Sequence, residues 1–541
     1  MFLLLWVWVL MSPRPAESEC RRQFAAKLLA YQADPIGFQL HVLNVKTWSI
    51  WSKMVEVAES VRDYQRTAVP AGHGVSKTFE AGRLVVWFKS CFVPSTVITT
   101  APSDNQVRNQ LWREIHAAVV GSKVPLGPAP TALMWDVRPS PATLAKLPPS
   151  DREAWEKNFA VGFATSPDTV GEHCTKMHGW HNKHVLIVLD EACGIARQIW
   201  STIMESLLIN ERCKILAIGN PTDPLSDFAE VCEAPDAQTD ISKPYMSKRG
   251  WHVVPISVKD TPNYIEGREV IPGVAGRDYE QLVATKHPPG SNGYLIRVEG
   301  RFPSYREGTY YGKEYATAEA AGRIGDYAWD PAFLVYRFAD LGDMYTAAVD
   351  VQFIRGRIRI IGDYWDNQGL GAVAFAQSMQ CKPWVWGKEH FAGPDLAGSN
   401  AKSFQTGKTT KDVLAGLGVN VAPVIRHAFD DGIQAVRLVW PLLDVSKQGA
   451  PTFLKAAQNY GKKKNEAAST DDQPVYYNSP AESWERHMMD ALRHLAMAYK
   501  YMRIGGQYVG DSRLVAAYHS QPKPAAGKVD WLRRERFARR S

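Results

Sequence analysis

Short apolar runs alternate with amphipathic segments in the first half of the chain. The run 66–69 precedes a glycine-containing loop at 70–76, and residues 77–92 carry apolar side chains at helical spacing. Three more runs rich in β-branched and aliphatic residues indicate buried strands, namely 95–100, 184–189 and 214–218. Strands that alternate with helices predict a parallel sheet with helical crossovers, in a domain over residues 41–305.

A different pattern fills the second half. Strand-like runs at 344–351 and 357–365 flank a glycine turn and predict a hairpin, with 384–386 as a third strand candidate. Residues 483–499 have the apolar stripe of an amphipathic helix. We therefore expect a second α/β domain over 341–505, joined to the first by a Gly-, Tyr- and charge-rich linker at 306–340, with a polar exposed loop at 460–478.

Composition supports two domains. The chain has 541 residues, 45% of them hydrophobic, whereas single cores stop growing at roughly 250–300 residues. That hydrophobic share excludes a disordered tail or a collagen-like fibre. Seven cysteines, odd in number and without a C-x-x-C pair, favour a reducing cytoplasm over a disulfide framework.

The two ends of the chain have special compositions. The segment 1–40 begins with about ten apolar residues, too few to span a bilayer and without a basic region before them, so we expect an upstream start or a docking segment. Charges interrupt the other apolar runs, so no membrane association is expected. The net charge is +7, and the tail 506–541 carries eight Lys or Arg against three Asp or Glu, or +5. Such a tail suits DNA or an acidic partner surface, with a solvated tail as the alternative.

A phosphate-binding loop is indicated by the sequence AGHGVSKT at 71–78, between a strand and a helix. Backbone amides would cradle the phosphates of ATP, Lys77 would reach the β- and γ-phosphates, and Thr78 would hold Mg²⁺. The predicted nucleotide contacts are Gly72, His73, Gly74, Val75, Ser76, Lys77 and Thr78. Ala71 and Ser76 replace the usual glycines, so a glycine-rich turn without nucleotide is the alternative.

Two further strand ends carry the matching polar groups. The strand 184–189 runs into Asp190, predicted beside Mg²⁺, and Glu191, predicted to orient the attacking water. The next strand enters a polar turn in which Asn220 and Thr222 would sense the γ-phosphate. Together the three elements predict an ATPase.

The order GHGVSKT, VITTAPS with QLW, VLIVLDEA, AIGNPTDP and YLIRVEGRFP resembles the large terminase subunit of tailed bacteriophages, over most of residues 30–505. This resemblance implies a P-loop ATPase domain with a parallel sheet, followed by a ribonuclease H-like α/β nuclease domain. It also implies double-stranded DNA, the portal protein and the small terminase subunit as partners, a homo-oligomeric ring on the portal, and the cytoplasm of the infected bacterial host. Met54 stands where the family would place an adenine-binding Gln, and Arg66, Arg108 and Arg113 are arginine-finger candidates, with surface solvation as the alternative.

The nuclease that the resemblance implies needs acidic residues converging on two Mg²⁺ or Mn²⁺ ions. Asp350 is a lone carboxylate in the apolar strand AAVDV, where burial without a partner or metal costs on the order of several kcal/mol. Asp490 lies in an otherwise apolar helical setting and resembles the acid of the last nuclease helix. Asp395 resembles the middle ligand, with Asp363 and Glu389 as competitors. Loss of any ligand should abolish cleavage and leave ATP hydrolysis intact.

A histidine-rich stretch suggests a different metal. His173, Cys174, His178, His181 and His184 are spaced like zinc ligands but lack a second cysteine pair, so a loop touching nucleotide or DNA is favoured. The leading hypothesis is an ATP-driven DNA translocase with an endonuclease. The alternatives are a helicase or remodelling ATPase without nuclease activity, and a degenerate prophage protein that binds DNA without hydrolysing ATP.

Overall fold

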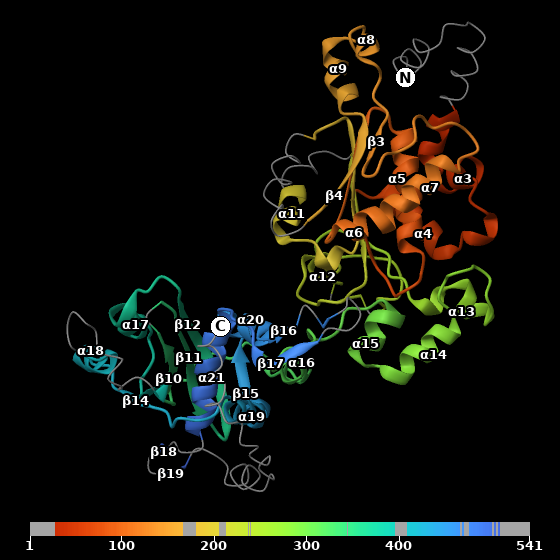
Figure 1. Cartoon of the computed structure of the whole chain (residues 1–541). Coiled ribbons are helices and arrows are strands. Elements are labelled where there is room, and N and C mark those ends of the chain that lie inside the picture. The colour runs from red at the N-terminus through yellow and green to blue at the C-terminus, as the bar shows by residue number, and fades with distance from the viewer. Residues whose placement is uncertain are drawn as a thin grey trace, which may run out of the picture. The chain divides into compact units, whose positions relative to one another are not determined.

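The computed structural model describes residues 27–165, 180–204, 212–235, 237–238, 240–342, 344–394, 408–465, 468–469, 475–499, 503–504 and 507–508. The chain divides into two compact units, Met1–Ser304 and Tyr305–Ser541 (Figure 1). Within the described ranges, no helix combines the length and apolar character needed to span a membrane.

The first unit is built on an eight-stranded sheet in the order β3-β4-β2-β5-β6-β1-β8-β7. The strands are β1 (Arg66–Pro70), β2 (Ser95–Ala101), β3 (Met134–Asp136), β4 (Phe159–Ala164), β5 (His184–Leu189), β6 (Cys213–Gly219), β7 (Tyr245–Met246) and β8 (His252–Val253). Only the edge pairs β3-β4 and β7-β8 are antiparallel. The predicted parallel sheet with helical crossovers is confirmed.

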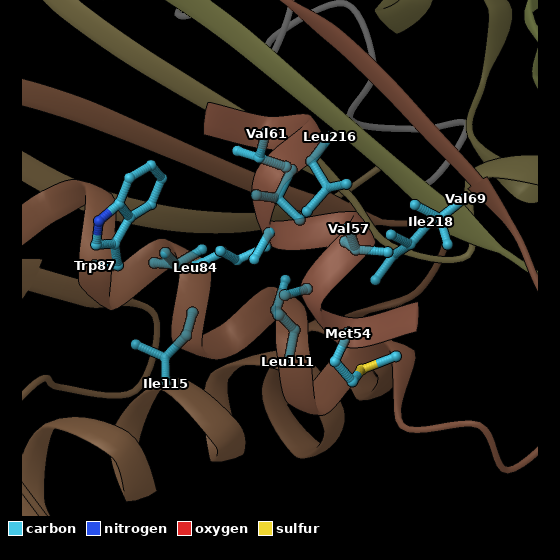
Figure 2. Close-up of a cluster of buried hydrophobic side chains, with 14 of the residues drawn as sticks. Met54, Val57, Val61, Val69, Leu84, Trp87, Leu111, Ile115, Leu216 and Ile218 are labelled. Carbon is cyan, nitrogen blue, oxygen red and sulfur yellow. The ribbon is translucent and has the colours of Figure 1, made fainter. Parts of the chain in front are cut away.

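Helices cover both faces of this sheet (Figure 1). On one face, α4 (Ser52–Asp63) and α5 (Lys77–Cys91) pack against Leu216 and Ile218 of β6, and α7 (Arg113–Val120) adds Ile115 to the same core beside α5 (Figure 2). On the other, α11 (Arg197–Thr202) and α12 (Asp227–Val231) share a core with the alternate β6 residues Ile215 and Ala217. Burial on both faces explains why the strands are continuous apolar runs.

Further helices of the first unit include α3 (Pro35–His41), α6 (Asp104–Gln106), η3 (Val107–Trp112), α8 (Pro141–Leu144), α9 (Pro149–Glu156), α13 (Pro262–Glu266), α14 (Arg277–Lys286), α15 (Asn292–Tyr294) and η7 (Leu295–Glu299). The π-helical turn η3 is anchored where Trp112 Nε1 donates to Thr99 Oγ1 at 2.8 Å.

The second unit contains a seven-stranded sheet in the order β14-β13-β10-β11-β12-β15-β9. The strands are β9 (Ile324–Gly325), β10 (Val335–Leu341), β11 (Thr346–Ile354), β12 (Arg357–Asp366), β13 (His390–Ala392), β14 (Val421–Pro423) and β15 (Leu443–Ser446). Strands β10, β11 and β12 form an antiparallel meander, which includes the predicted hairpin, and the outer strands run parallel to their neighbours. The second unit is therefore α/β, as predicted.

The two faces of this sheet meet different helices. On one face, Phe338 and Val349 share a core with α16 (Gly312–Ala320), α19 (Phe429–Val439), α20 (Pro451–Asn459) and α21 (Glu485–Tyr499). On the other, Ala339 and Ala348 pack with α17 (Gly371–Gln380) and α18 (Thr410–Gly416). Because side chains alternate along a strand, Asp340 of β10 points to the same face as Phe338, and Asp350 of β11 points to the same face as Ala348.

Three segments differ from the sequence prediction. Residues 306–340 are not a separate linker, because α16, β9 and most of β10 lie in that range and pack into the second unit. Residues 384–386 contribute one bridge, between Trp386 and Val335, and the strand forms later as β13. The expected loop at 460–478 contains β16 (Lys462–Lys464), which pairs with β17 (Tyr476–Pro480).

At the ends of the chain, residues 1–26 and 509–541 are outside the described ranges, and the pair β18 (Arg503–Ile504) and β19 (Gln507–Tyr508) precedes the tail.

Candidate nucleotide and metal sites

The predicted phosphate loop connects β1 to α5. Gly74 and Ser76 both adopt the left-handed conformation, with φ of 65° at each. Ser76 is the N-cap of α5, and its side chain makes no capping hydrogen bond. The first N–H groups of a helix have no acceptor within the helix. The start of α5 is therefore an uncapped helix N-terminus, which favours a bound anion.

The phosphate loop forms backbone hydrogen bonds with Ile256 and with the segment 294–303. His73 N donates to Arg297 O at 2.9 Å, and Gly72 N donates to Ile256 O at 2.8 Å. A Cβ on Gly72 would lie 3.0 Å from Arg297 O, and a Cβ on Gly300 would collide with Ile256 O. Sequence reasoning treated YLIRVEGRFP only as part of a family resemblance. Its structural role is to support the loop, and Gly300, with φ of 63°, was the available signal.

The two departures from the usual glycine pattern have different consequences. Ala71 is buried outside the left-handed region; its N–H donates to Gly219 O at 3.0 Å and its carbonyl accepts from Asn220 Nδ2 at 2.7 Å. Its methyl group is thus accommodated. Ser76 carries a Cβ in a left-handed conformation, which costs roughly 1–2 kcal/mol.

Asp190 follows β5 and is fully buried. Its Oδ1 accepts from Glu191 N at 3.0 Å, whereas Oδ2 has no hydrogen-bond partner among the described residues; the nearby Thr78 hydroxyl acts to lower the pKa of the carboxyl group. Burial, reinforced by the charge of Glu191, raises the pKa of Asp190 to about 7. A buried carboxylate oxygen without a partner beside a hydroxyl fits Mg²⁺, which prefers oxygen ligands.

Lys77, Glu191 and Asn220 meet at the same edge of the sheet. Lys77 Nζ lies 3.3 Å from Glu191 Oε1 and donates to Asn220 Oδ1 at 3.1 Å. Asn220 N donates to Glu191 Oε2 at 3.4 Å. The turn after β6 approaches this closely because Gly219 has no side chain, since a Cβ there would lie 2.8 Å from Ala192 N. The structure thus brings the three predicted motifs of the first unit together.

The positions predicted to contact adenine or to supply an arginine finger have other roles in the structure. Met54 is buried in the core beneath α4, so it cannot contact adenine (Figure 2). Arg108 pairs with Asp104 at 2.6 Å, and Arg113 lies 3.6 Å from Glu114 with its own side chain mostly exposed. Surface solvation accounts for both arginines.

The zinc hypothesis falls largely outside the described residues, which exclude His173, Cys174 and His178. Among the described residues, no three His, Cys, Asp or Glu side chains are placed to hold a metal ion. Burial lowers the pKa of His184 to about 4.

In the second unit, Asp350 forms an ion pair and does not join Asp490. Arg337 on β10 donates from Nε to Asp350 Oδ1 at 2.6 Å and from Nη2 to Oδ2 at 2.8 Å, with both side chains buried. The guanidinium also lies 5.0 Å from the ring centroid of Phe375 on α17. Asp350 lies two residues after Ala348 on β11, so its side chain points to the same face of the sheet, which packs on α17 and not on α21. Asp350 and Asp490 do not form the expected common metal site, because Asp350 lies on the opposite face of the sheet from α21, where Arg337 binds both of its oxygens.

Asp340, which sequence reasoning missed, lies on the face that carries Asp490. His487 Nδ1 of α21 is 2.9 Å from Asp340 Oδ2, and Asp490 pairs with Arg493 one turn later. Burial raises the pKa of Asp490 to about 6, opposed by Arg493 and reinforced by Asp340. The signal that was available is the strand-like run VYRFA, which is apolar except for Arg337 and is followed by an acid. Asp190 was predicted from the same kind of pattern.

The remaining acidic candidates have separate positions. Asp395 lies outside the described residues. The strand that precedes it, β13, pairs Ala392 with Ala339, next to Asp340. Asp363 accepts from Phe453 N at 2.7 Å at the start of α20, which is a structural role, and Glu389 is exposed. The described residues thus supply Asp340 and Asp490 as the carboxylates of a candidate metal site.

We expect Ser76→Gly to raise the free energy of unfolding by about 1 kcal/mol, because relief of left-handed strain exceeds the entropic cost of glycine. Ser201→Gly is the matched control, since Ser201 is exposed in the right-handed helix α11. It should lower stability by about 0.5 kcal/mol. Urea unfolding followed by tryptophan fluorescence measures both. A change in the free energy of unfolding of the same sign in both variants would contradict the strain proposed for Ser76.

We expect Asp350→Ala to lower the free energy of unfolding of the second unit by about 3–5 kcal/mol, because it leaves Arg337 buried without its partner. The double variant Arg337→Met/Asp350→Leu should recover most of that loss. Circular dichroism during urea unfolding gives the comparison. A folded Asp350→Ala chain with wild-type stability would show that the ion pair has no structural role.

Comparison with solved structures finds large terminases of bacteriophages, while no family model and no curated protein matches the chain. The HK97 large terminase is 10% identical, with 87% of this chain and 98% of that chain covered and a TM-score of 0.36. The Thermus phage P74-26 large terminase ATPase domain is 14% identical, with 49% and 97% covered and a TM-score of 0.31. The manganese-bound nuclease domain of the SPP1 large terminase is 14% identical, with 33% and 96% covered and a TM-score of 0.23.

At these values, the matches assign no role to any residue of this chain. The chain is similar to these bacteriophage large terminase structures.

Proposed function

We propose that the chain is an ATP-driven DNA-packaging motor with a metal-dependent endonuclease, of the large terminase type. The observation that carries this proposal is the convergence of Lys77, Thr78, Asp190 and Glu191 at one edge of the parallel sheet. Two separate segments, the start of α5 and the end of β5, supply these groups, and a glycine-rich turn without nucleotide would not require that arrangement. The helicase alternative shares this site and differs in the second unit.

In the ATPase site, the uncapped start of α5 and the Lys77 ammonium would bind the phosphates. Thr78 and Asp190 would hold Mg²⁺, which when bound neutralises charge on the phosphate oxygens. The Glu191 carboxylate would orient the attacking water and accept its proton. Asn220 accepts from Lys77 through Oδ1 and donates from its backbone N–H to the Glu191 carboxylate, so it would connect the state of the nucleotide to the turn after β6.

In the second unit, Asp340 and Asp490 would bind a divalent cation, Mg²⁺ or Mn²⁺, that stabilises charge on the cleaved DNA phosphate. His487 would orient the Asp340 carboxylate through their 2.9 Å hydrogen bond. Asp395 stays a candidate for a further ligand. Asp350 is removed from the set because Arg337 holds it.

The biological setting follows from the resemblance. We propose double-stranded concatemeric phage DNA as the substrate, with the portal protein and the small terminase subunit as partners. The chain would act as a homo-oligomeric ring on the portal, in the cytoplasm of the infected host. The basic tail 506–541 is the proposed docking segment for DNA or an acidic portal surface.

For the motor, we expect Lys77→Ala and Glu191→Gln each to reduce ATP turnover at least about 100-fold, since each removes a group acting on the transferred phosphate. Lys286→Ala, at an exposed site in α14, is the matched control and should retain full activity. Phosphate release by the purified chain in Mg²⁺ is the measurement. Turnover no higher in the wild type than in Lys77→Ala would instead support the degenerate DNA-binding alternative.

For the nuclease, we expect Asp340→Asn to reduce Mn²⁺-dependent nicking of plasmid DNA at least about 100-fold while ATP turnover is unchanged, because a metal ligand is lost. Asp431→Asn, an exposed acid at the start of α19, controls for the loss of one charge. Gel electrophoresis of plasmid topoisomers measures the effect. If the wild type cuts under neither Mg²⁺ nor Mn²⁺, the helicase or remodelling alternative is favoured.

A further inference from the structure

A cluster of aromatic rings borders the Asp340 site. It consists of Tyr345, Trp365, Trp484 and His487, and we call it the aromatic platform. The rings of Tyr345 and Trp365 are nearly parallel, at 9° with centroids 5.9 Å apart, and Tyr345 also stacks on His487 at 5.1 Å. Trp484 extends the platform with a centroid 5.3 Å from that of Trp365.

The platform and the carboxylates are connected through one side chain. His487 stacks on Tyr345 with its ring and bonds Asp340 Oδ2 through Nδ1, at 2.9 Å. Asp490 lies on the same helix, less than one turn later. The aromatic platform is therefore in direct contact with the Asp340 carboxylate through His487.

The platform differs from the structural aromatic cluster of the same unit. Tyr311 and Tyr460 are stacked with no exposed surface, as expected for rings whose role is packing. Tyr345 instead remains 42% exposed, and its neighbour Met344 is 62% exposed. Tyr345 therefore keeps ring surface that is accessible to a ligand beside the acidic groups.

We propose that the aromatic platform stacks an unpaired nucleobase of a DNA strand whose phosphate lies at Asp340 and Asp490. This inference rests on the proposed nuclease function, because the divalent cation that the acidic groups would hold gives the strand its position. A base has an aromatic face that any of the four bases can present to a tyrosine ring. Bases within an intact duplex stack on one another, so the occupant is a frayed, nicked or single-stranded segment.

The test uses the full chain with Ca²⁺ in place of Mg²⁺ and Mn²⁺, so that the carboxylates can hold a cation, and an intact probe on a gel after the measurement verifies that binding is measured without cleavage. The probe is a fluorescein-labelled ten-nucleotide oligo(dT), and the readout is fluorescence anisotropy. Tyr345→Leu removes the ring and Tyr345→Phe retains it. Tyr477→Leu is the matched control, because Tyr477 is 47% exposed in the same unit on β17.

We expect Tyr345→Leu to weaken oligo(dT) binding roughly tenfold, the effect of losing one stacked base. Tyr345→Phe and Tyr477→Leu should remain within about twofold of the wild type. A blunt hairpin duplex should bind all four proteins equally. Melting curves of each variant verify that the second unit is folded.

Several results would overturn the platform. These are wild-type affinity of Tyr345→Leu for oligo(dT), an equal loss in Tyr345→Phe, an equal loss for the hairpin duplex, or absence of oligo(dT) binding by the wild type. The nuclease proposal fails separately, when Asp340→Asn cuts plasmid DNA as the wild type does. If the chain shows no nuclease activity but Tyr345→Leu still weakens oligo(dT) binding, the base-stacking role of the platform is supported and the nuclease proposal is contradicted.

Discussion

Burial of both sheet faces is the constraint on which the rest of the structure depends. In each unit, helices cover the two sides of the sheet, so a mid-strand position cannot present a charge to water. A charged group must then lie near or beyond the end of a strand, pair with an opposite charge, or form hydrogen bonds with the backbone as Asp363 does. Asp190 follows the last residue of β5, and Asp340 lies one residue before the end of β10. Asp350, in the middle of β11, is paired with Arg337.

The same constraint explains why the nucleotide site forms at one edge. In a parallel sheet the carboxyl ends of β1, β5 and β6 face the same direction, so the three turns that follow them are neighbours. Packing then decides the details. Gly219 permits the β6 turn to contact the Glu191 turn, and Gly72 and Gly300 let the phosphate loop rest on residues 294–303.

The repeating elements could be predicted from the sequence because their signals are local. The strands at 66–69, 95–100 and 184–189 and the helix at 77–92 match observed elements within two residues at each end. Asp190 and Glu191 were found because a strand end is visible in one segment. Asp350 was misassigned since its partner is 13 residues away in sequence and directly opposite on β10, a register that alternation alone does not reveal.

Asp340 was overlooked because composition suggested a linker around it, although the apolar run before it has the form of a strand. The basic tail stays a prediction, being outside the described residues.

Ser76 shows how strain and function are related in the first unit. The left-handed conformation of Ser76 positions the start of α5 so that its N–H groups are uncapped, and a side chain at that position gains no hydrogen bond in return. Glu191, also left-handed with φ of 49°, is held by Lys77 and by Asn220 N. Two strained residues therefore flank Lys77, and each is retained where its backbone directs polar groups toward the phosphate position. Strain of this kind persists only where surrounding contacts outweigh it, and in the phosphate loop those contacts include the hydrogen bonds that Gly72 N and His73 N donate to the carbonyls of Ile256 and Arg297.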